Sequence, residues 1–228
     1  MSNITELLLE NKDVKYAEFS KKIIPDTKHQ IIGVRTPKLK QIAKEIIKDK
    51  NAFFEFINEK HTYHEEFLLH GLLLGEYKEN ISKLLAFLRE FIPHIDNWAV
   101  CDLTVSALKI IKNYKTKVLE LLLKLLSSSH PYSIRFAIVT LMWYYLDSEY
   151  YDRSVALVYE RLNSDNYYIN MSIAWFFCTA IIKDYNKAIS CLIDKKLPKF
   201  IHNKTIQKCI DSFRLPQQTK TFLKTLKI

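Results

Sequence analysis

Trp98 and Asp102 stand four residues apart in the stretch DNWAVCDL, residues 96–103. Because residues i and i+4 share one face of an α-helix, the indole and the carboxylate are expected side by side. On a helical wheel from Asn97 onward, one side carries Ala99, Val100, Leu103, Ala107, Ile110 and Ile111, and the other carries Trp98, Asp102, Val105 and Lys109. Two interpretations stay open. Either Trp98 packs on a neighbouring helix while Asp102 pairs with a lysine, or the two residues form a working surface.

Arg135 is the second residue that could do chemistry. It is the only charged residue between Pro131 and Leu146, and burying an unpaired guanidinium is costly. The sequence therefore predicts an anionic partner, which is either Asp102 or a phosphate at the helix surface. The uncharged segment 167–182, with Asn170 and Trp175, predicts a helix buried between neighbours. It is too short and too polar for a membrane span.

Other catalytic or metal-binding patterns are weak. The stretch HTYHEE (61–66) has the order H-x-x-H-E, which differs from the order of a zinc-protease motif. We therefore expect ordinary residues on a helix surface there. Cys101, Cys178, Cys191 and Cys209 lack metal-ligand spacing and indicate reduced thiols in a cytoplasmic protein. Three glycines are too few for a glycine-rich phosphate loop. No metal, cofactor or membrane partner is expected.

The charge is unevenly distributed. The net charge is +9; residues 183–228 contribute +8 and residues 21–50 contribute +6, whereas residues 51–182 carry −3. The two basic ends are either solvated lysine-rich faces or two arms that flank a polyanion. The charge alone does not decide between them.

The elements that must position these residues are helices. No alternating strand pattern competes, and we expect one domain over residues 1–228. Thr36 is predicted to cap a helix whose first residue is Pro37, with Leu39, Ile42, Ala43, Ile46 and Ile47 as its apolar stripe. The expected helices cover residues 3–12, 15–23, 36–50, 51–59, 63–77, 80–91, 97–112, 115–127, 131–146, 150–162, 167–182, 184–194, 203–213 and 217–226.

A repeat indicates how these helices stack. Residues 125–138 align with residues 161–174 at an offset of 36, with Leu126 on Leu162, Ser128 on Ser164 and Tyr132 on Tyr168. The stretch HNKTIQKCI (202–210) resembles the start of another such helix. Two-helix units of this period are typical of curved HEAT-like stacks, so the fold class predicted is all-α, an α-α superhelix of antiparallel helix pairs.

The chain resembles the AlkD-like DNA alkylation repair glycosylases, which are HEAT-like stacks. The resemblance covers most of the chain, and its combined motifs are fairly specific. The matching pieces are GVRTPKLKQIAKEI (33–46), DNWAVCD (96–102), SIRFAIVTL (133–141), NMSIAW (170–175) and FIHNKTIQKCIDSF (200–213). On this likeness Trp98, Asp102, Arg135 and Trp175 match the family's active-site positions. A tyrosine of the family falls on Phe19, which keeps the ring and loses the hydroxyl.

The resemblance implies a monomeric DNA glycosylase that hydrolyses the N-glycosidic bond of alkylated, cationic purines in duplex DNA. Asp102 would be catalytic, and Trp98, Trp175 and Arg135 would bind the substrate. Contacts to flanking phosphates are expected from Lys38, Lys44, Asn203, Lys204 and Lys208, with Asn203 at a helix N-terminus. The alternatives are a non-catalytic HEAT-like scaffold that binds nucleic acid or an acidic protein, and a weakened relative that only recognises damaged DNA.

Overall fold

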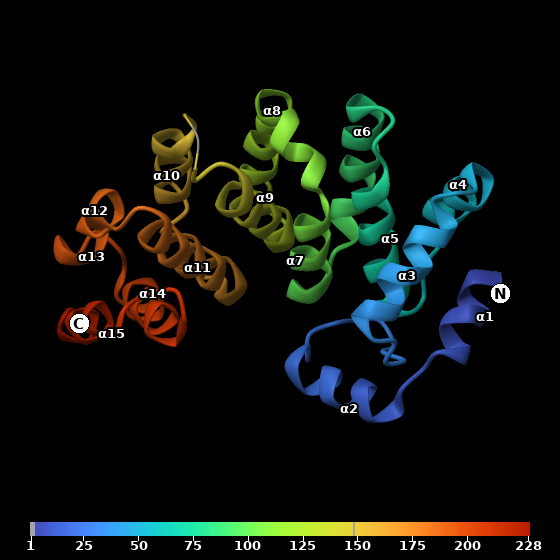
Figure 1. Cartoon of the computed structure of the whole chain (residues 1–228), viewed down its shortest axis with the longest axis horizontal. Coiled ribbons are helices and arrows are strands. Elements are labelled where there is room, and N and C mark those ends of the chain that lie inside the picture. The colour runs from blue at the N-terminus through green and yellow to red at the C-terminus, as the bar shows by residue number, and fades with distance from the viewer. Residues whose placement is uncertain (1–2, 148) are drawn as a thin grey trace. The chain divides into compact units, whose positions relative to one another are not determined.

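The computed structural model describes residues 3–147 and 149–228. Within these residues the regular elements are all helices, and the only strand-like pairing is an isolated bridge between Gln30 and Tyr63. The predicted all-α class is confirmed. The chain divides into two compact units, Met1–Val118 and Leu119–Ile228, whose helices are labelled in Figure 1.

Unit 1 contains the elements that carry Trp98 and Asp102. Its helices are α1 (Asn3–Glu10), α2 (Val14–Ile23), α3 (Thr36–Ile46), α4 (Lys50–Asn58), α5 (His64–Glu76), α6 (Ile81–Phe91), η1 (Ile92–His94), α7 (Trp98–Ala107), η2 (Lys109–Asn113) and the start of α8 (Lys115–Leu126). A long loop, residues 24–35, joins α2 to α3.

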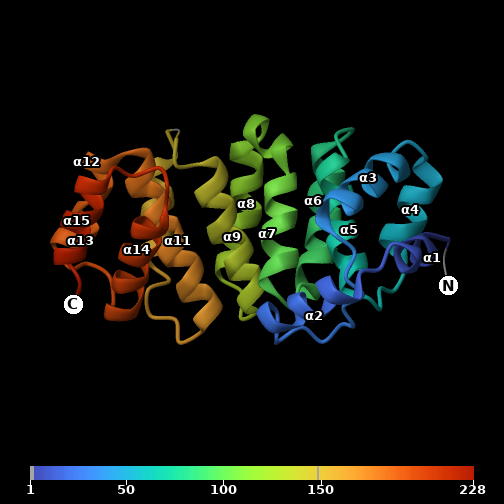
Figure 2. The ribbon, with the colours of Figure 1, turned by 60° about the horizontal axis from the view of Figure 1, so that its bottom comes forward.

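Helix α5 is the centre of unit 1. Every residue from His64 to Gly75 is buried, and α5 packs on α3 and on α7, as Figures 1 and 2 show. Two glycines allow the close approach to α7: a β-carbon at Gly71 would collide with the Thr104 hydroxyl, and one at Gly75 would collide with Ala107. Glycine is needed here for space, because no other residue lets the two backbones come so close.

Unit 2 contains the elements that carry Arg135 and Trp175. Its helices are the remainder of α8, then α9 (Pro131–Tyr144), α10 (Tyr151–Tyr159), α11 (Tyr167–Lys183), α12 (Tyr185–Ala188), α13 (Ser190–Ile193), α14 (Lys199–Asp211) and α15 (Gln217–Thr225). Helix α11 is the centre of this unit and packs on α9 and α14.

The predicted repeat is visible in how α9 and α11 begin. Their capping residues, His130 and Asn166, lie 36 residues apart and each accepts backbone N–H bonds from the first turn through its side chain. The residue two positions earlier repeats as well: Ser128 accepts from the His130 amide at 3.0 Å, and Ser164 accepts from the Asn166 amide at 3.2 Å. The repeat is therefore a repeated helix start, as a fold built from repeated helical units requires.

Several predicted helix boundaries were wrong. The helix expected over residues 97–112 ends at Ala107, because Leu108 leaves the helical conformation and a 3-10 turn follows. The helix expected over 184–194 is two short helices that divide at Ile189. Thr36 is the first residue of α3 rather than its cap: Arg35 holds the cap position, and Pro37 stands second.

The cysteines and the apolar helices can be compared with what the composition predicts. The four cysteines are buried, and none of them is in a disulfide bond. Among residues 3–147 and 149–228, no helix combines the length and the apolarity that a bilayer span requires.

Candidate active site

The N-terminus of α7 holds Trp98 in a fixed position. Asn97 caps the helix, and its side-chain oxygen accepts from the amides of Ala99 and Val100 at 3.0 and 3.1 Å. The indole N–H of Trp98 donates to the carbonyl of Ile23, the last residue of α2, at 3.0 Å. The edge of the indole ring is thus hydrogen-bonded to α2, and the two faces of the ring do not take part in this bond.

Trp98 and Asp102 line one pocket of about 340 Å³, called here the Trp98 pocket. Its walls come from α2, the loop after it, α3, α5 and α7. The lining residues are Tyr16, Ser20, Ile23, Ile24, Val34, Thr36, His64, Glu65, Leu68, Trp98, Ala99, Asp102, Leu103 and Ser106. The predicted pairing of Trp98 with Asp102 on one helix face is confirmed.

The helical wheel misplaced other residues of α7. Leu103 was expected on the apolar side, but it is half-buried and lines the Trp98 pocket. Val105 was expected beside Asp102, but it is fully buried with Val100, Cys101 and Thr104. Because α7 packs against α5 along that face, the buried stripe is rotated from the one that hydropathy alone selects. Lys109 lies beyond the end of the helix, in the 3-10 turn that follows it.

Glu65 is a second carboxylate in the wall of the pocket. It is buried, and its two oxygens accept from the amides of Gly33 at 2.7 Å and Ile32 at 3.0 Å. Burial raises the pKa of this carboxyl, while the amide bonds oppose that rise. Glu65 therefore fixes the loop before α3, in which Gly33 takes a positive φ of 92° that glycine tolerates.

His64 presents an N–H donor whose position can be deduced from its neighbours. The Asn97 amide orientation is set by its capping bonds, so its nitrogen donates to Asp96 Oδ1 at 2.7 Å and faces His64 Nδ1 at 3.3 Å. His64 Nδ1 is thus the acceptor. Burial lowers the pKa of His64 to about 4, so the ring is neutral at pH 7 and carries its proton on Nε2.

The prediction that residues 61–66 lie on a helix surface was wrong. His64, Glu65 and Glu66 are all buried. Glu66 tolerates burial because its carboxylate accepts from the Thr5 hydroxyl and from the amides of Thr62 and Tyr63, at 2.6, 2.6 and 2.9 Å. These carboxylates and the imidazole are buried because each has partners, which the sequence pattern could not show.

Tyr16, not Phe19, supplies the aromatic residue that α2 places in the pocket. Phe19 is 55% exposed and stacks on the outside of Tyr16, with the ring centroids 6.3 Å apart. The Arg35 guanidinium lies 4.7 Å from the Tyr16 ring centroid and is held by Asp13 at 2.8 Å. Asp13 also caps α2 through the Tyr16 amide, so these three residues fix one another at the pocket's edge.

Arg135 and Trp175 belong to unit 2. Arg135, on α9, is buried, and its Nη1 donates to the carbonyl of Tyr168 at 2.9 Å, so one of its acceptors is neutral rather than anionic. Trp175, on α11, is half-buried, and the Lys208 ammonium of α14 lies 5.9 Å from its ring centroid. The family resemblance implies that this pair and the pair of Trp98 and Asp102 form one active site, and this stays a prediction.

The residues proposed for phosphate contacts are on two helices. Lys38 is half-exposed and Lys44 is exposed on α3, while Lys204 and Lys208 are half-exposed on α14. Asn203 was expected at a helix N-terminus, which was wrong: α14 begins at Lys199, and Asn203 lies inside it. Its amide donates to the Ile228 carbonyl at 2.6 Å and accepts from the Ile228 amide at 3.1 Å, so it holds the C-terminal segment.

The described residues contain no group of three His, Cys, Asp or Glu side chains arranged to hold a metal ion. His61 and His64 of the HTYHEE stretch line different cavities.

Comparison with known families places most of the chain in one of them. The model of the DNA alkylation repair enzyme family matches residues 4–207, which run from the first turn of α1 into α14. Comparison with curated proteins found no similar sequence. The family match covers Trp98, Asp102, Arg135 and Trp175. The chain therefore belongs to the DNA alkylation repair enzyme family.

Proposed function

We propose that this protein is a DNA glycosylase that hydrolyses the N-glycosidic bond of purines carrying an alkyl group on N3 or N7. The observation that carries the proposal is the Trp98 pocket, where an indole and a carboxylate share one face of α7. Membership of the alkylation repair family supports this substrate class, and so does a pocket lined by an indole and a carboxylate, which suits a cation.

The alkylated base is already an activated leaving group. A ring-alkylated purine is cationic, so breaking the bond between its nitrogen and the sugar returns the electron pair to the base and neutralises it. The positive charge moves to the sugar as an oxocarbenium ion, and water adds to the anomeric carbon and releases a proton. No general acid is needed, in contrast to glycosidases that use two carboxylates.

Asp102 is the group proposed to stabilise this transition state and to orient the attacking water. Trp98 would place its π-face against the cationic base or sugar, a contact worth roughly 0.5–2 kcal/mol in a partly dry site. His64 would add an N–H donor without adding charge. A protonated imidazole at that position would repel the developing cation, so the buried, neutral state suits the reaction.

The residues proposed to bind DNA lie outside the Trp98 pocket. We propose that Arg135 and Trp175 bind the substrate, with the guanidinium on a backbone phosphate and the indole on a base or sugar. Lys38, Lys44, Lys204 and Lys208 would contact flanking phosphates. The protein would act as a monomer, with residues 1–228 as a single functional domain and without a metal or cofactor.

A single-turnover assay on duplex DNA with an N7- or N3-methylated purine tests the proposal. Release of the methylated base by the wild type, and its loss in Asp102→Asn, are the expected results. Asp165→Asn, an exposed carboxylate of unit 2, is the matched control and should release the base normally. DNA binding with no base release by the wild type would favour the non-catalytic scaffold.

A further inference from the structure

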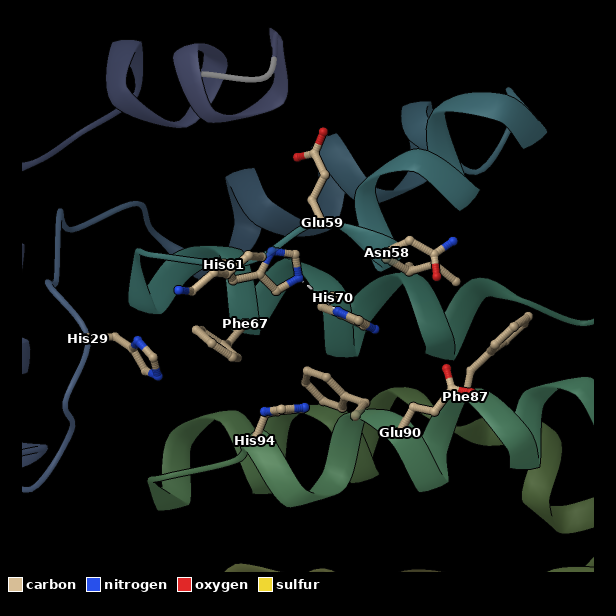
Figure 3. Close-up of a pocket in the computed structure, with 12 residues that line it drawn as sticks. His29, Asn58, Glu59, His61, Phe67, His70, Phe87, Glu90 and His94 are labelled. Carbon is tan, nitrogen blue, oxygen red and sulfur yellow. Dashed lines mark hydrogen bonds between the residues drawn. The ribbon is translucent and has the colours of Figure 1, made fainter.

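Helix α5 separates two cavities of unit 1. His64 and Glu65 line the Trp98 pocket, whereas Phe67 and His70 line a second, larger cavity of about 590 Å³ (Figure 3). We call it the histidine cavity, because His29, His61, His70 and His94 all lie in its wall. Its volume is within the range of small-molecule sites.

Aromatic rings form much of this wall and hold one another in place. His70 stacks on Phe91 with the ring centroids 4.2 Å apart and the planes 25° apart. The ring centroid of Phe67 lies 4.1 Å from that of His29 and 5.2 Å from that of His61, and the rings of Phe67 and His61 meet edge to face. A wall made of aromatic rings favours a flat, aromatic ligand, which can contact the rings by its face or by its edge.

His61 and His70 together form a hydrogen-bonding pair with a defined pattern. Their rings are joined by a bond of 2.8 Å between His61 Nε2 and His70 Nδ1. Burial lowers the pKa of His61 to about 4 and that of His70 to about 3, so both are neutral at pH 7. Whichever ring donates the shared proton, one outer nitrogen of the pair is then a donor and the other an acceptor.

The surroundings of His70 disfavour an anion. Figure 3 shows its outer nitrogen directed toward the side where Asn58, Phe87 and Glu90 lie. Two carboxylates, Glu59 and Glu90, line the cavity against a single lysine, Lys60. The neutral rings of His61 and His70 add no positive charge, so the two glutamates outnumber the positive charge of Lys60 in this part of the lining.

We propose that the histidine cavity binds a small planar nitrogen heterocycle, neutral or cationic and of nucleobase size. Its ring would stack between the aromatic walls, and its edge would bond to the outer nitrogen of His70, with Glu90 favouring positive charge. This site is separate from the Trp98 pocket and does not depend on the glycosylase activity proposed for that pocket.

Adenine is a suitable probe, because it is planar and carries a donor and an acceptor on one edge. Binding to the wild-type protein at pH 7.4 is measured by calorimetry and by imidazole ¹⁵N shifts in NMR. Micromolar to low-millimolar affinity is expected, with the shifts of His61 and His70 changing. Benzamidinium and benzoate have similar size and opposite charge, and benzamidinium should bind the more tightly of the two.

Two variants locate the site. His70→Phe keeps a ring against Phe91 and removes both nitrogens, so adenine affinity should fall about tenfold or more, the cost of a lost hydrogen bond to a buried group. Glu90→Gln changes an exposed side chain, so the fold is not at risk, and it should abolish the preference for benzamidinium. Trp98→Phe alters only the other pocket and should leave adenine binding unchanged.

Three results would overturn the proposal. The first is that neither adenine nor benzamidinium binds the wild type at millimolar concentration. The second is that His70→Phe binds adenine as well as the wild type does while Trp98→Phe does not, which would place the ligand in the Trp98 pocket. The third is that Zn²⁺ shifts the His61 and His70 resonances and adenine does not, which would make the cavity a metal site.

Discussion

The Asn97 amide nitrogen faces Nδ1 of His64 across 3.3 Å, and this contact sets the protonation pattern of the imidazole in the pocket wall. Asn97 cannot turn its amide over, because its oxygen caps α7. A helix cap thus decides which nitrogen of a histidine in a neighbouring helix carries the proton. The same amide nitrogen donates to Asp96, which binds the Lys28 amide at 2.6 Å and so joins the loop after α2 to the network.

Replacing His64 by Asn and by Gln separates its two nitrogens. Asn reaches the position of Nδ1 and can still accept from Asn97, whereas Gln reaches the position of Nε2 and keeps a donor there. If the Nε2 proton serves the reaction, His64→Gln should retain more base release than His64→Asn. Thermal stability should follow the opposite order, because His64→Gln leaves the Asn97 amide with a poorer acceptor. Equal base release by the two variants would contradict the role given to Nε2.

Asp102→Asn keeps the size of the side chain and removes its charge. If Asp102 stabilises a cationic transition state, single-turnover release of a methylated purine should slow by about 10²–10³. DNA affinity should stay the same or tighten, since a carboxylate near phosphates repels them. Rate, affinity and melting temperature are measured on the same preparation. Normal release together with a sharply lowered melting temperature would make Asp102 a structural residue.

DNA binding should depend strongly on salt. Each phosphate neutralised by a lysine releases a counterion, so the affinity falls steeply as the salt concentration rises. Lys44→Gln should weaken binding and reduce the slope of log affinity against log salt by about one. Lys124→Gln, an exposed lysine of α8, is the control and should change neither. Wild-type binding that is flat between low and physiological salt would rule out the phosphate contacts.

Stability should rise between about pH 4 and pH 6.5. Burial depresses the pKa of His61, His64 and His70, so in this range the unfolded chain binds more protons than the folded one. Folding is then favoured as the pH rises, by about 1.4 kcal/mol per histidine for each unit by which its pKa is lowered. Glu65, whose pKa is raised, acts in the opposite direction but is a single group. Chemical unfolding at several pH values measures the slope, which His70→Phe should reduce.

Gly71→Ala should destabilise unit 1. The added methyl group meets the Thr104 hydroxyl on α7, and overpacking of this kind costs roughly 1–3 kcal/mol. The double variant Gly71→Ala/Thr104→Ala removes the colliding atoms and should recover part of the loss, as a thermodynamic cycle would show. If the two single changes simply add, the collision is not the cause.

The sequence was informative where the pattern is local. The spacing of Trp98 and Asp102 predicted their common face, and the offset of 36 residues predicted the repeated starts of α9 and α11. Helix ends were predicted less well, because the turn at Leu108 interrupts an apolar pattern that would otherwise continue.

The rest of the pocket could not be predicted, because it is made by contacts distant in sequence. His64 and Glu65 resembled surface residues since their partners lie 32 or 33 residues away along the chain. Tyr16 was missed in favour of Phe19, although Tyr16, Ser20 and Ile23 share one face of α2 and all line the Trp98 pocket. That helical spacing is the signal that could have identified Tyr16 beforehand.

The burial of α5 on all sides has a consequence for local motion. A helix with no exposed face has no low-energy way to fray or detach, so its amides should exchange with solvent only when unit 1 opens as a whole. Both cavities use α5 as a wall. They therefore form and disappear in a single cooperative step, and neither can melt while the other stays intact.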